Sequence, residues 1–336
     1  MSVCTWFGTS CNASGYIEYL HFQNNNLQGH IPAAIGELVH LVSVSFDQNE
    51  ISGTIPTEIG LLQNLQSLHF FNSQISGNLP TEIGQLSSLR NLLLYNTELT
   101  GTLPTEIGLL QNLQRLYLHN SHFSGSIPTE FGLLSSIRNI FIDNSQVSGT
   151  IPTEIGQLSS LLNLFIDNSN LSGSLPTELG SLTKLQRLYL HNNAQISGSL
   201  PTEIGQLPML LSLSMFNTQI SGILPSELGS LENLQYLYLH STQISGELPK
   251  EIGQLSNLFV LRLDLTEVNG TLPITFGELT RLKYINLRES NLSGSFPGEF
   301  CKLFVDGKLA TIHASITITR SQTSPDALSA CTSYMF

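Results

Sequence analysis

The chain has 336 residues, of which 40% are apolar and 11% are charged, and its formal net charge is −12. The apolar share is ample for a buried core, which excludes a disordered chain. No apolar stretch approaches the ~18 residues that a membrane-spanning helix needs. The first lysine or arginine is Arg90, so a surface for nucleic acid is not expected.

A repeat of 24 residues dominates the sequence. Twelve prolines follow it, with a single step of 25 residues, at positions 32, 56, 80, 104, 128, 152, 176, 201, 225, 249, 273 and 297. A glycine precedes each of these prolines by three residues. Fixed periods of this length are typical of solenoids, in which each repeat buries its apolar face against its neighbours.

One repeat shows the predicted elements in chain order. Residues 116–118 (Leu-Tyr-Leu) alternate, which predicts a short strand with one buried face. Gly125 predicts a tight bend, and Pro128 predicts a turn or the first position of a helix. Phe131 and Leu134 are three residues apart, a spacing that favours a short 3-10 turn packing inward.

The unit L-x-x-L-x-L-x-x-(N/S/T)-x-L-(S/T)-G-x-(I/L)-P resembles the plant-type leucine-rich repeat over residues 17–305, which is twelve units. The resemblance implies a right-handed solenoid with a concave parallel β-sheet and with short 3-10 helices and turns on its convex side. Residues 4–11 (CTWFGTSC) are similar to the family's amino-terminal cap motif C-x-W-x-G-V-x-C, with Thr9 in place of valine. We therefore expect a cap at 1–16, the repeats at 17–305 and a carboxyl-terminal cap at 306–336, closed by an alternating strand at 310–318.

Four cysteines allow three pairings. Twelve strands stacked at ~4.8 Å separate the chain ends by roughly 50 Å, whereas a disulfide needs Cα atoms within ~7 Å. The predicted bridges are therefore Cys4–Cys11 and Cys301–Cys331. Paired cysteines indicate an extracellular or cell-surface protein.

Other features bear on the compartment. Four N-x-S/T sequons are candidates for glycosylation: Asn12, Asn170, Asn269 and Asn291. No signal peptide precedes Cys4, which a trimmed amino terminus explains. The alternative is a cytosolic repeat protein with free thiols.

Aromatic and acidic residues gather at outward strand positions in the middle repeats. The candidate ligand-binding residues on the concave face are Tyr117, His119, Phe141, Asp143, Phe165, Asp167, Tyr189 and His191. The rings would form an aromatic floor, the aspartates anionic anchors and the histidines flanking donors, because exposed apolar patches generally mark contact sites. The alternative is that neighbouring rings only stabilise the sheet. No catalytic residue, metal site or cofactor is predicted, since four ligands on four strands cannot all reach one ion.

The family resemblance implies a non-enzymatic recognition module that binds a protein, peptide or glycan, as receptor ectodomains and polygalacturonase-inhibitor-like proteins do. One alternative is an ice-binding solenoid, because serines and threonines recur on either side of the bend glycines, as at Thr100 and Thr102. A neighbouring column of glutamates, such as Glu106, argues against a clean ice-binding plane. Another alternative is a structural or adhesive protein of a cell wall or matrix.

Overall fold

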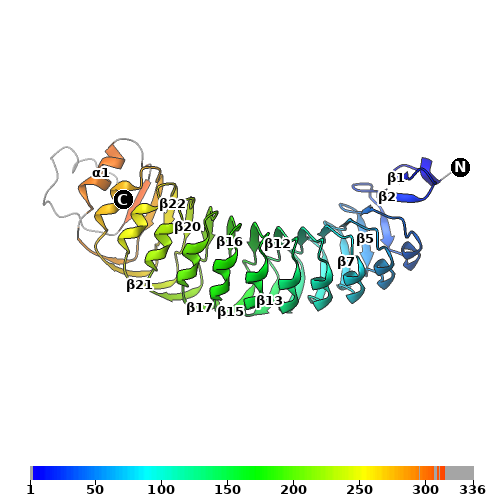
Figure 1. The fold of residues 1–336 in the computed structure, drawn as a ribbon, viewed down its shortest axis with the longest axis horizontal. Helices are drawn as coiled ribbons and strands as arrows, with labels where there is room; N and C mark the ends of the chain where they lie inside the picture. The colour runs from blue at the N-terminus through cyan, green and yellow to red at the C-terminus, as the bar shows by residue number, and fades with distance from the viewer. Residues whose placement is uncertain (1–2, 295, 306–308, 310, 315–336) are drawn as a thin grey trace. The chain divides into compact units, whose positions relative to one another are not determined.

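The computed structural model describes residues 3–294, 296–305, 309 and 311–314, without the side chains of some residues in 301–305. The chain forms two compact units, Met1–Asn170 and Leu171–Phe336. In both units, a strand of a first sheet, a strand of a second sheet and a short 3-10 helix follow one another in each repeat (Figure 1). The division into caps at 1–16 and 306–336 around repeats at 17–305 stays a prediction.

In the first unit, the first sheet has the order β1-β2-β4-β6-β8-β10-β12-β14. Its strands are β1 (Thr9–Cys11), β2 (Ile17–His21), β4 (Ser43–Ser45), β6 (Ser67–His69), β8 (Asn91–Leu93), β10 (Arg115–Tyr117), β12 (Asn139–Phe141) and β14 (Asn163–Phe165). The second sheet is made of β3 (Gln28–His30), β5 (Glu50–Gly53), β7 (Gln74–Asn78), β9 (Glu98–Thr102), β11 (His122–Ser126) and β13 (Gln146–Gly149). The 3-10 helices are η1 (Val3–Thr5), η2 (Ala33–Glu37), η3 (Thr57–Leu61), η4 (Thr81–Gln85), η5 (Thr105–Leu109), η6 (Thr129–Leu133) and η7 (Thr153–Gln157).

In the second unit, the first sheet contains β16 (Arg187–Tyr189), β18 (Ser212–Ser214), β20 (Tyr236–Tyr238), β22 (Val260–Arg262), β24 (Tyr284–Leu287) and β26 (Thr311–Ala314). The second sheet contains β15 (Asn170–Ser174), which starts at the boundary, β17 (Gln195–Ser199), β19 (Gln219–Gly222), β21 (Gln243–Glu247), β23 (Glu267–Gly270) and β25 (Asn291–Leu292). The helices are η8 (Thr177–Ser181), η9 (Thr202–Gln206), η10 (Ser226–Ser230), η11 (Lys250–Gln254), η12 (Ile274–Glu278) and an α-helix, α1 (Gly298–Val305).

The core has the composition that the repeat predicts. In the repeat of β10, the predicted inward residues are buried, and Leu116, Leu118 and Phe131 are 0% exposed. In the first sheet, parallel neighbours pair in register, for example Leu116 with Ile140, so equivalent residues of successive repeats lie side by side. In the second sheet the pairing is shifted by two residues, for example Gly125 with Val147. Pro128 does not begin the 3-10 helix as its first residue, but directly precedes η6 with φ −63°. A proline there has no amide to leave unpaired.

The glycine that follows each repeat's proline lies where successive 3-10 helices come closest. A Cβ added to Gly84 of η4 would stand 2.6 Å from the carbonyl oxygen of Glu106 and 2.7 Å from its Cβ. The same close approach recurs at Gly60 and Gly108 in this unit, and at Gly205 and Gly229 in the other. The repeat spacing on this side of the molecule therefore depends on a residue without a side chain.

The turn after each first-sheet strand is held by polar side chains. Asn49 accepts hydrogen bonds from the amides of Asn25 and Leu27 at 2.9 and 3.0 Å, and its amide donates to the carbonyls of Phe22 and Phe46 at 2.7 and 3.0 Å. In most repeats a hydroxyl replaces this asparagine. The hydroxyls of Ser73, Thr97, Thr218, Thr242, Thr266 and Ser290 donate to the carbonyl three residues earlier at 2.5 to 2.8 Å. The hydroxyl thus keeps the bond within its own repeat.

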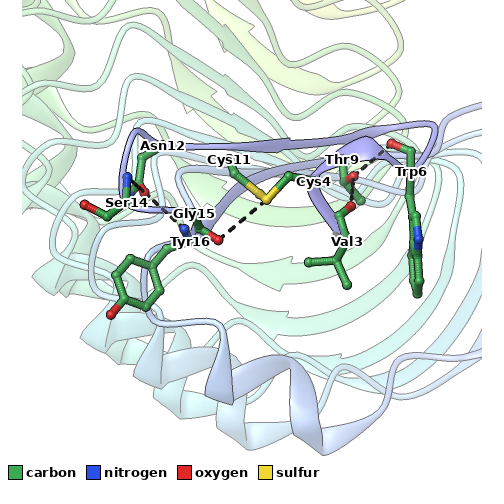
Figure 2. Close-up of a disulfide and its surroundings, with 9 residues drawn as sticks. All are labelled: Val3, Cys4, Trp6, Thr9, Cys11, Asn12, Ser14, Gly15 and Tyr16. Carbon is green, nitrogen blue, oxygen red and sulfur yellow. Dashed lines mark hydrogen bonds between the residues drawn. A yellow bond between two sulfur atoms is a disulfide. The ribbon is translucent and has the colours of Figure 1, made fainter. Parts of the chain in front are cut away.

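The amino-terminal cap contains a disulfide between Cys4 and Cys11, whose Cα atoms are 5.5 Å apart. Figure 2 shows the cap around it, where the Thr9 hydroxyl donates to the carbonyls of Val3 and Trp6 at 2.6 and 2.8 Å. Strand β1 pairs antiparallel with β2 and so covers the first edge of the sheet. Asn12, a candidate for glycosylation, lies in the turn between these strands. Its side-chain oxygen accepts hydrogen bonds from the backbone amides of Ser14 and Tyr16.

At the other end of the chain, β26 pairs in parallel register with β24. It occupies part of the predicted closing strand at 310–318, whose remaining residues 310 and 315–318 lie outside the described residues. The predicted Cys301–Cys331 bridge also lies outside them, since neither side chain is described. No helix among the residues that the structure describes is long and apolar enough to cross a membrane.

Candidate functional site

The outward face of the first sheet carries the predicted site. Each three-residue strand points its middle residue into the core, as Leu116 of β10 does, and leaves Tyr117 on the opposite face. Of the eight predicted residues, six lie in the first unit and Tyr189 and His191 in the second.

Three of the predicted rings form one row in the first unit. Tyr117, Phe141 and Phe165 occupy equivalent positions on β10, β12 and β14. The centroid of the Phe141 ring is 4.5 Å from that of Tyr117 and 4.4 Å from that of Phe165, with interplanar angles of 9° and 6°. The rings cover one another's faces and turn their edges outward. The predicted floor is therefore a row of ring edges rather than of ring faces.

A second row of rings lies in the neighbouring column of the first unit. Of its residues, only His119 was predicted from the sequence as a ligand-binding residue. Phe71, Tyr95 and His119 stack with centroid distances of 4.5 Å and interplanar angles of 8°. The imidazole of His119 then meets Phe141 edge-on at 6.2 Å and 61°, which joins the two rows. Phe71 and Tyr95 could have been found from the sequence, because they share the column of His119 at steps of 24 residues.

The two predicted carboxyl groups continue this second column. Asp143 and Asp167 each stand two residues beyond a strand, and the side-chain amide of the following asparagine donates to each, from Asn144 at 3.0 Å and from Asn168 at 2.8 Å. Burial, together with the charge of Asp143, raises the pKa of Asp167 to about 7. Burial also raises the pKa of Asp143, against the opposing effect of His119. Near neutral pH, Asp167 is thus only partly ionised, and it is a weaker anionic anchor than the sequence predicted.

The histidine beside these carboxyl groups is held in its neutral form. Burial lowers the pKa of His119, although the charge of Asp143 opposes the effect. Its Nδ1 atom is buried and has no hydrogen-bond partner among the described residues. A neutral imidazole has one donor and one acceptor nitrogen, and the role of His119 as a donor to a ligand stays a prediction.

In the second unit, the outward face repeats the same kind of arrangement. Tyr189 meets His191 edge-on at 6.1 Å, and His191, Phe216 and His240 stack at 4.2 and 4.4 Å. Burial lowers the pKa of both His191 and His240 to about 4. The imidazole Nδ1 of His191 lies 3.1 Å from the hydroxyl of Ser214, a separation that corresponds to a hydrogen bond.

Other polar residues of the face have partners within the protein. Arg262 donates to both carboxylate oxygens of Asp264, at 3.0 and 2.8 Å. A column of asparagines at the edge of the face has φ near +53°, and sequence analysis missed it: Asn120 donates to Asn96 at 2.7 Å, and Asn96 to Asn72 at 2.5 Å. Within the described part of the chain, no three histidine, cysteine or acidic side chains are grouped so that they could hold a metal ion.

Comparisons with known proteins agree with this geometry. A family model described as leucine-rich repeat region matches residues 16–150 and 81–197, and one described as Leucine Rich Repeat matches residues 233–255 and 281–303. The chain belongs to the leucine-rich repeat family. No curated protein matches it.

Among solved structures, this leucine-rich repeat protein is similar to plant receptors. A TDR receptor is 33% identical with a TM-score of 0.82, over 87% of this chain and 50% of that one. The plant peptide hormone receptor RGFR1, solved with RGF2, is 30% identical with a TM-score of 0.82, over 98% of this chain and 55% of that one. The chain therefore spans about half the length of these receptors. A plant ice-binding protein is 29% identical with a TM-score of 0.66, over 74% of this chain and 80% of that one.

Proposed function

We propose that the protein is a non-enzymatic extracellular recognition module whose outward face binds a ligand, with the rows of stacked rings and their carboxyl neighbours as the contact surface. The observation that carries this proposal is the half-exposure of Tyr117, Phe141 and Phe165 on the side opposite the core. Exposed aromatic groups beside a few polar ones are typical of binding hot spots. The similarity to RGFR1, a peptide hormone receptor, supports a ligand-binding role.

Among the candidate ligands (protein, peptide or glycan), the ring geometry favours a polypeptide. Sugars commonly pack on the faces of aromatic rings, but here each face of Phe141 is covered by a neighbouring ring. Ring edges carry partial positive charge and attract electron-rich groups such as carbonyl oxygens. An extended peptide offers carbonyl oxygens along its length, and its amide N–H groups can donate hydrogen bonds to Asp143 and Asp167.

The competing explanation is that the rows only stabilise the sheet, since each cross-strand pair contributes roughly 0.2–1 kcal/mol. A double variant, Phe141→Ser with Phe165→Ser, separates the two. The wild-type protein is used to capture ligands from the extracellular fluid of its source, and the captured ligand is then titrated against both proteins. We expect at least a tenfold loss of affinity, equivalent to about 1.4 kcal/mol.

Phe7→Ser is the matched control, because Phe7 is an exposed phenylalanine at 78% that lies in the amino-terminal cap, between η1 and β1. It should leave the affinity unchanged. A double variant that unfolds at lower temperature but binds as tightly as the wild type would assign the rows to stability alone.

The extracellular location is part of the same proposal. It is supported by the Cys4–Cys11 disulfide, because such bonds persist in oxidising compartments. Mass spectrometry of native protein under non-reducing conditions tests it. Four free thiols in that material would contradict the location.

Ice binding is the second candidate, and the second sheet is the observation that favours it. Parallel strands, each paired with its neighbour at a shift of two residues, carry a column of exposed polar residues after the bend glycine, namely Thr54, Asn78, Thr102, Ser126 and Thr150. The threonine methyls lie over glycines of the next strand, since a Cβ added to Gly125 would be 2.9 Å from Cγ2 of Thr102. The row is thus ordered before any ligand arrives.

Thermal hysteresis and ice-recrystallisation assays of the wild type, Thr102→Tyr and Thr150→Tyr test the ice-binding candidate. The large tyrosine side chains would break a flat surface without touching the core. Activity that is present in the wild type and lost in both variants would support ice binding over ligand recognition. Absence of activity in the wild type would exclude it.

A further inference from the structure

A cavity of about 590 Å³ lies in the second unit, between the second sheet and the 3-10 helices, away from the outward face. Its apolar lining includes Leu200, Ile223, Pro225 and Pro249, and its charged lining is Glu227 and Glu247. The volume is within the range of small-ligand and side-chain pockets.

Two neighbouring repeats depart from the usual residue at one position of the cavity lining. The residue after the bend glycine is Ser174 or Ser199 in the preceding repeats, but Ile223 and Glu247 in the next two. Both side chains rest on glycines of the following strand: a Cβ on Gly246 would lie 2.6 Å from Cγ2 of Ile223, and one on Gly270 would lie 2.8 Å from Cγ of Glu247. They are therefore held at the rim of the cavity.

The equivalent hollow in the first unit has a different chemistry. It measures about 330 Å³, and Thr102 stands there at the position of Ile223. Asn78 and Glu106 also line it. The hollow thus recurs in the repeat, whereas an exposed isoleucine stands at this position only in the repeat of Ile223, which is 67% exposed.

The charges at the cavity have one sign. Glu227 stands in the first turn of η10, where Ser226 donates to its Oε2 at 3.1 Å, and Glu247 ends β21. Neither carboxylate is in an ion pair among the described residues. The basic residue nearest in sequence, Lys250, follows Pro249 and does not line the cavity. An apolar wall between two carboxylates is complementary to a cation that carries an aliphatic group.

We propose that this cavity binds a basic polypeptide segment in which lysine or arginine flanks an aliphatic residue. The cationic groups lie against Glu227 and Glu247, and the aliphatic side chain packs on Ile223 and Pro249. The site goes beyond the proposed function, since it uses neither ring row of the outward face and would recruit a second partner.

Binding of two peptides that carry fluorescein on their amino terminus, fluorescein-Lys-Leu-Lys-amide and its acidic counterpart fluorescein-Glu-Leu-Glu-amide, tests the proposal by fluorescence anisotropy. The basic peptide should bind saturably and more weakly as salt rises, because exposed ion pairs are screened. Ile223→Thr and Glu247→Ser, which restore residue types found elsewhere in this column, should each weaken binding by about tenfold. The methyl NMR signals of Ile223 should shift when unlabelled peptide is added to the wild type.

Ile274→Thr is the matched control, because Ile274 is an equally exposed isoleucine, at 66%, that does not line the cavity. It should bind as the wild type does, and so should the Phe141/Phe165 double variant, which separates this site from the outward face. Equal binding of the acidic peptide, or unchanged affinity in Ile223→Thr, would overturn the proposal. If hexylamine shifts the Ile223 methyl signals and binds with higher affinity than the peptide, the ligand is a small amine and not a polypeptide.

Discussion

Replacing Gly84 by alanine tests the claim that a missing side chain sets the spacing of the repeats. The new Cβ would lie 2.6 Å from the carbonyl oxygen of Glu106 and 2.7 Å from its Cβ, whereas carbon atoms in ordinary contact are ~3.5–4.0 Å apart. Because two of the three nearest atoms are backbone, a rotamer change cannot relieve the clash, and η4 and η5 must separate by close to an ångström. Overpacking of this kind costs about 1–3 kcal/mol.

The alanine also reduces the conformational freedom of the unfolded chain, which stabilises by about 0.4–1 kcal/mol where the native backbone tolerates it. The expected net loss in the free energy of unfolding is therefore about 1–2 kcal/mol. Urea unfolding followed by circular dichroism measures it. Gln85→Ala, an exposed change in the same helix, should stay within about 0.5 kcal/mol of the wild type. If Gly84→Ala is as stable as Gln85→Ala, the close approach does not set the spacing.

Further predictions concern the turns and the titrating groups. Asn49→Ala removes five hydrogen bonds and should cost about 3 kcal/mol, whereas Thr97→Val removes one and should cost about 1 kcal/mol, both measured by urea unfolding. Since the folded protein raises the pKa of Asp167 to about 7, this group favours folding when protonated, and its contribution should fall as pH rises from about 4 to 7. Asp167→Asn should flatten that part of the dependence of the melting temperature on pH, and an unchanged profile would contradict the assignment. The lowered pKa of His191 acts in the opposite sense, so stability should fall as pH drops from about 6.5 to 4, and His191→Phe should weaken this fall.

The repeat alone predicts much of the fold, because each unit carries its whole pattern of inward residues. The strand at 116–118 corresponds to β10 (Arg115–Tyr117), and the inward turn at Phe131 to η6. The second sheet was not predicted as a sheet. Its strands contain a glycine with φ near +75°, as at Gly125, and few β-branched residues, so they look like bends until neighbouring repeats supply their hydrogen bonds.

The candidate site was predicted only at the level of which residues share a face. Alternation places Tyr117 and Phe141 outward, but the orientation of their rings follows from contact with the neighbouring strand, which a single repeat does not contain. The charge state of Asp167 likewise depends on burial and on Asp143, a residue 24 positions away. The turn asparagines, such as Asn96, were overlooked because they adopt a left-handed backbone conformation. The spacing of apolar residues carries no information about that conformation.

The bend glycines have a consequence for how such a protein can change. Most of them pack against a single side chain of the preceding repeat, as Gly125 does against Thr102, and that side chain contributes nothing to the interior. Threonine, asparagine, serine, isoleucine and glutamate all occupy this position within one molecule, as at Thr102, Asn78 and Ile223. Mutation can therefore change this surface one position at a time while the buried leucines stay unchanged. New binding specificities can thus arise here without loss of stability.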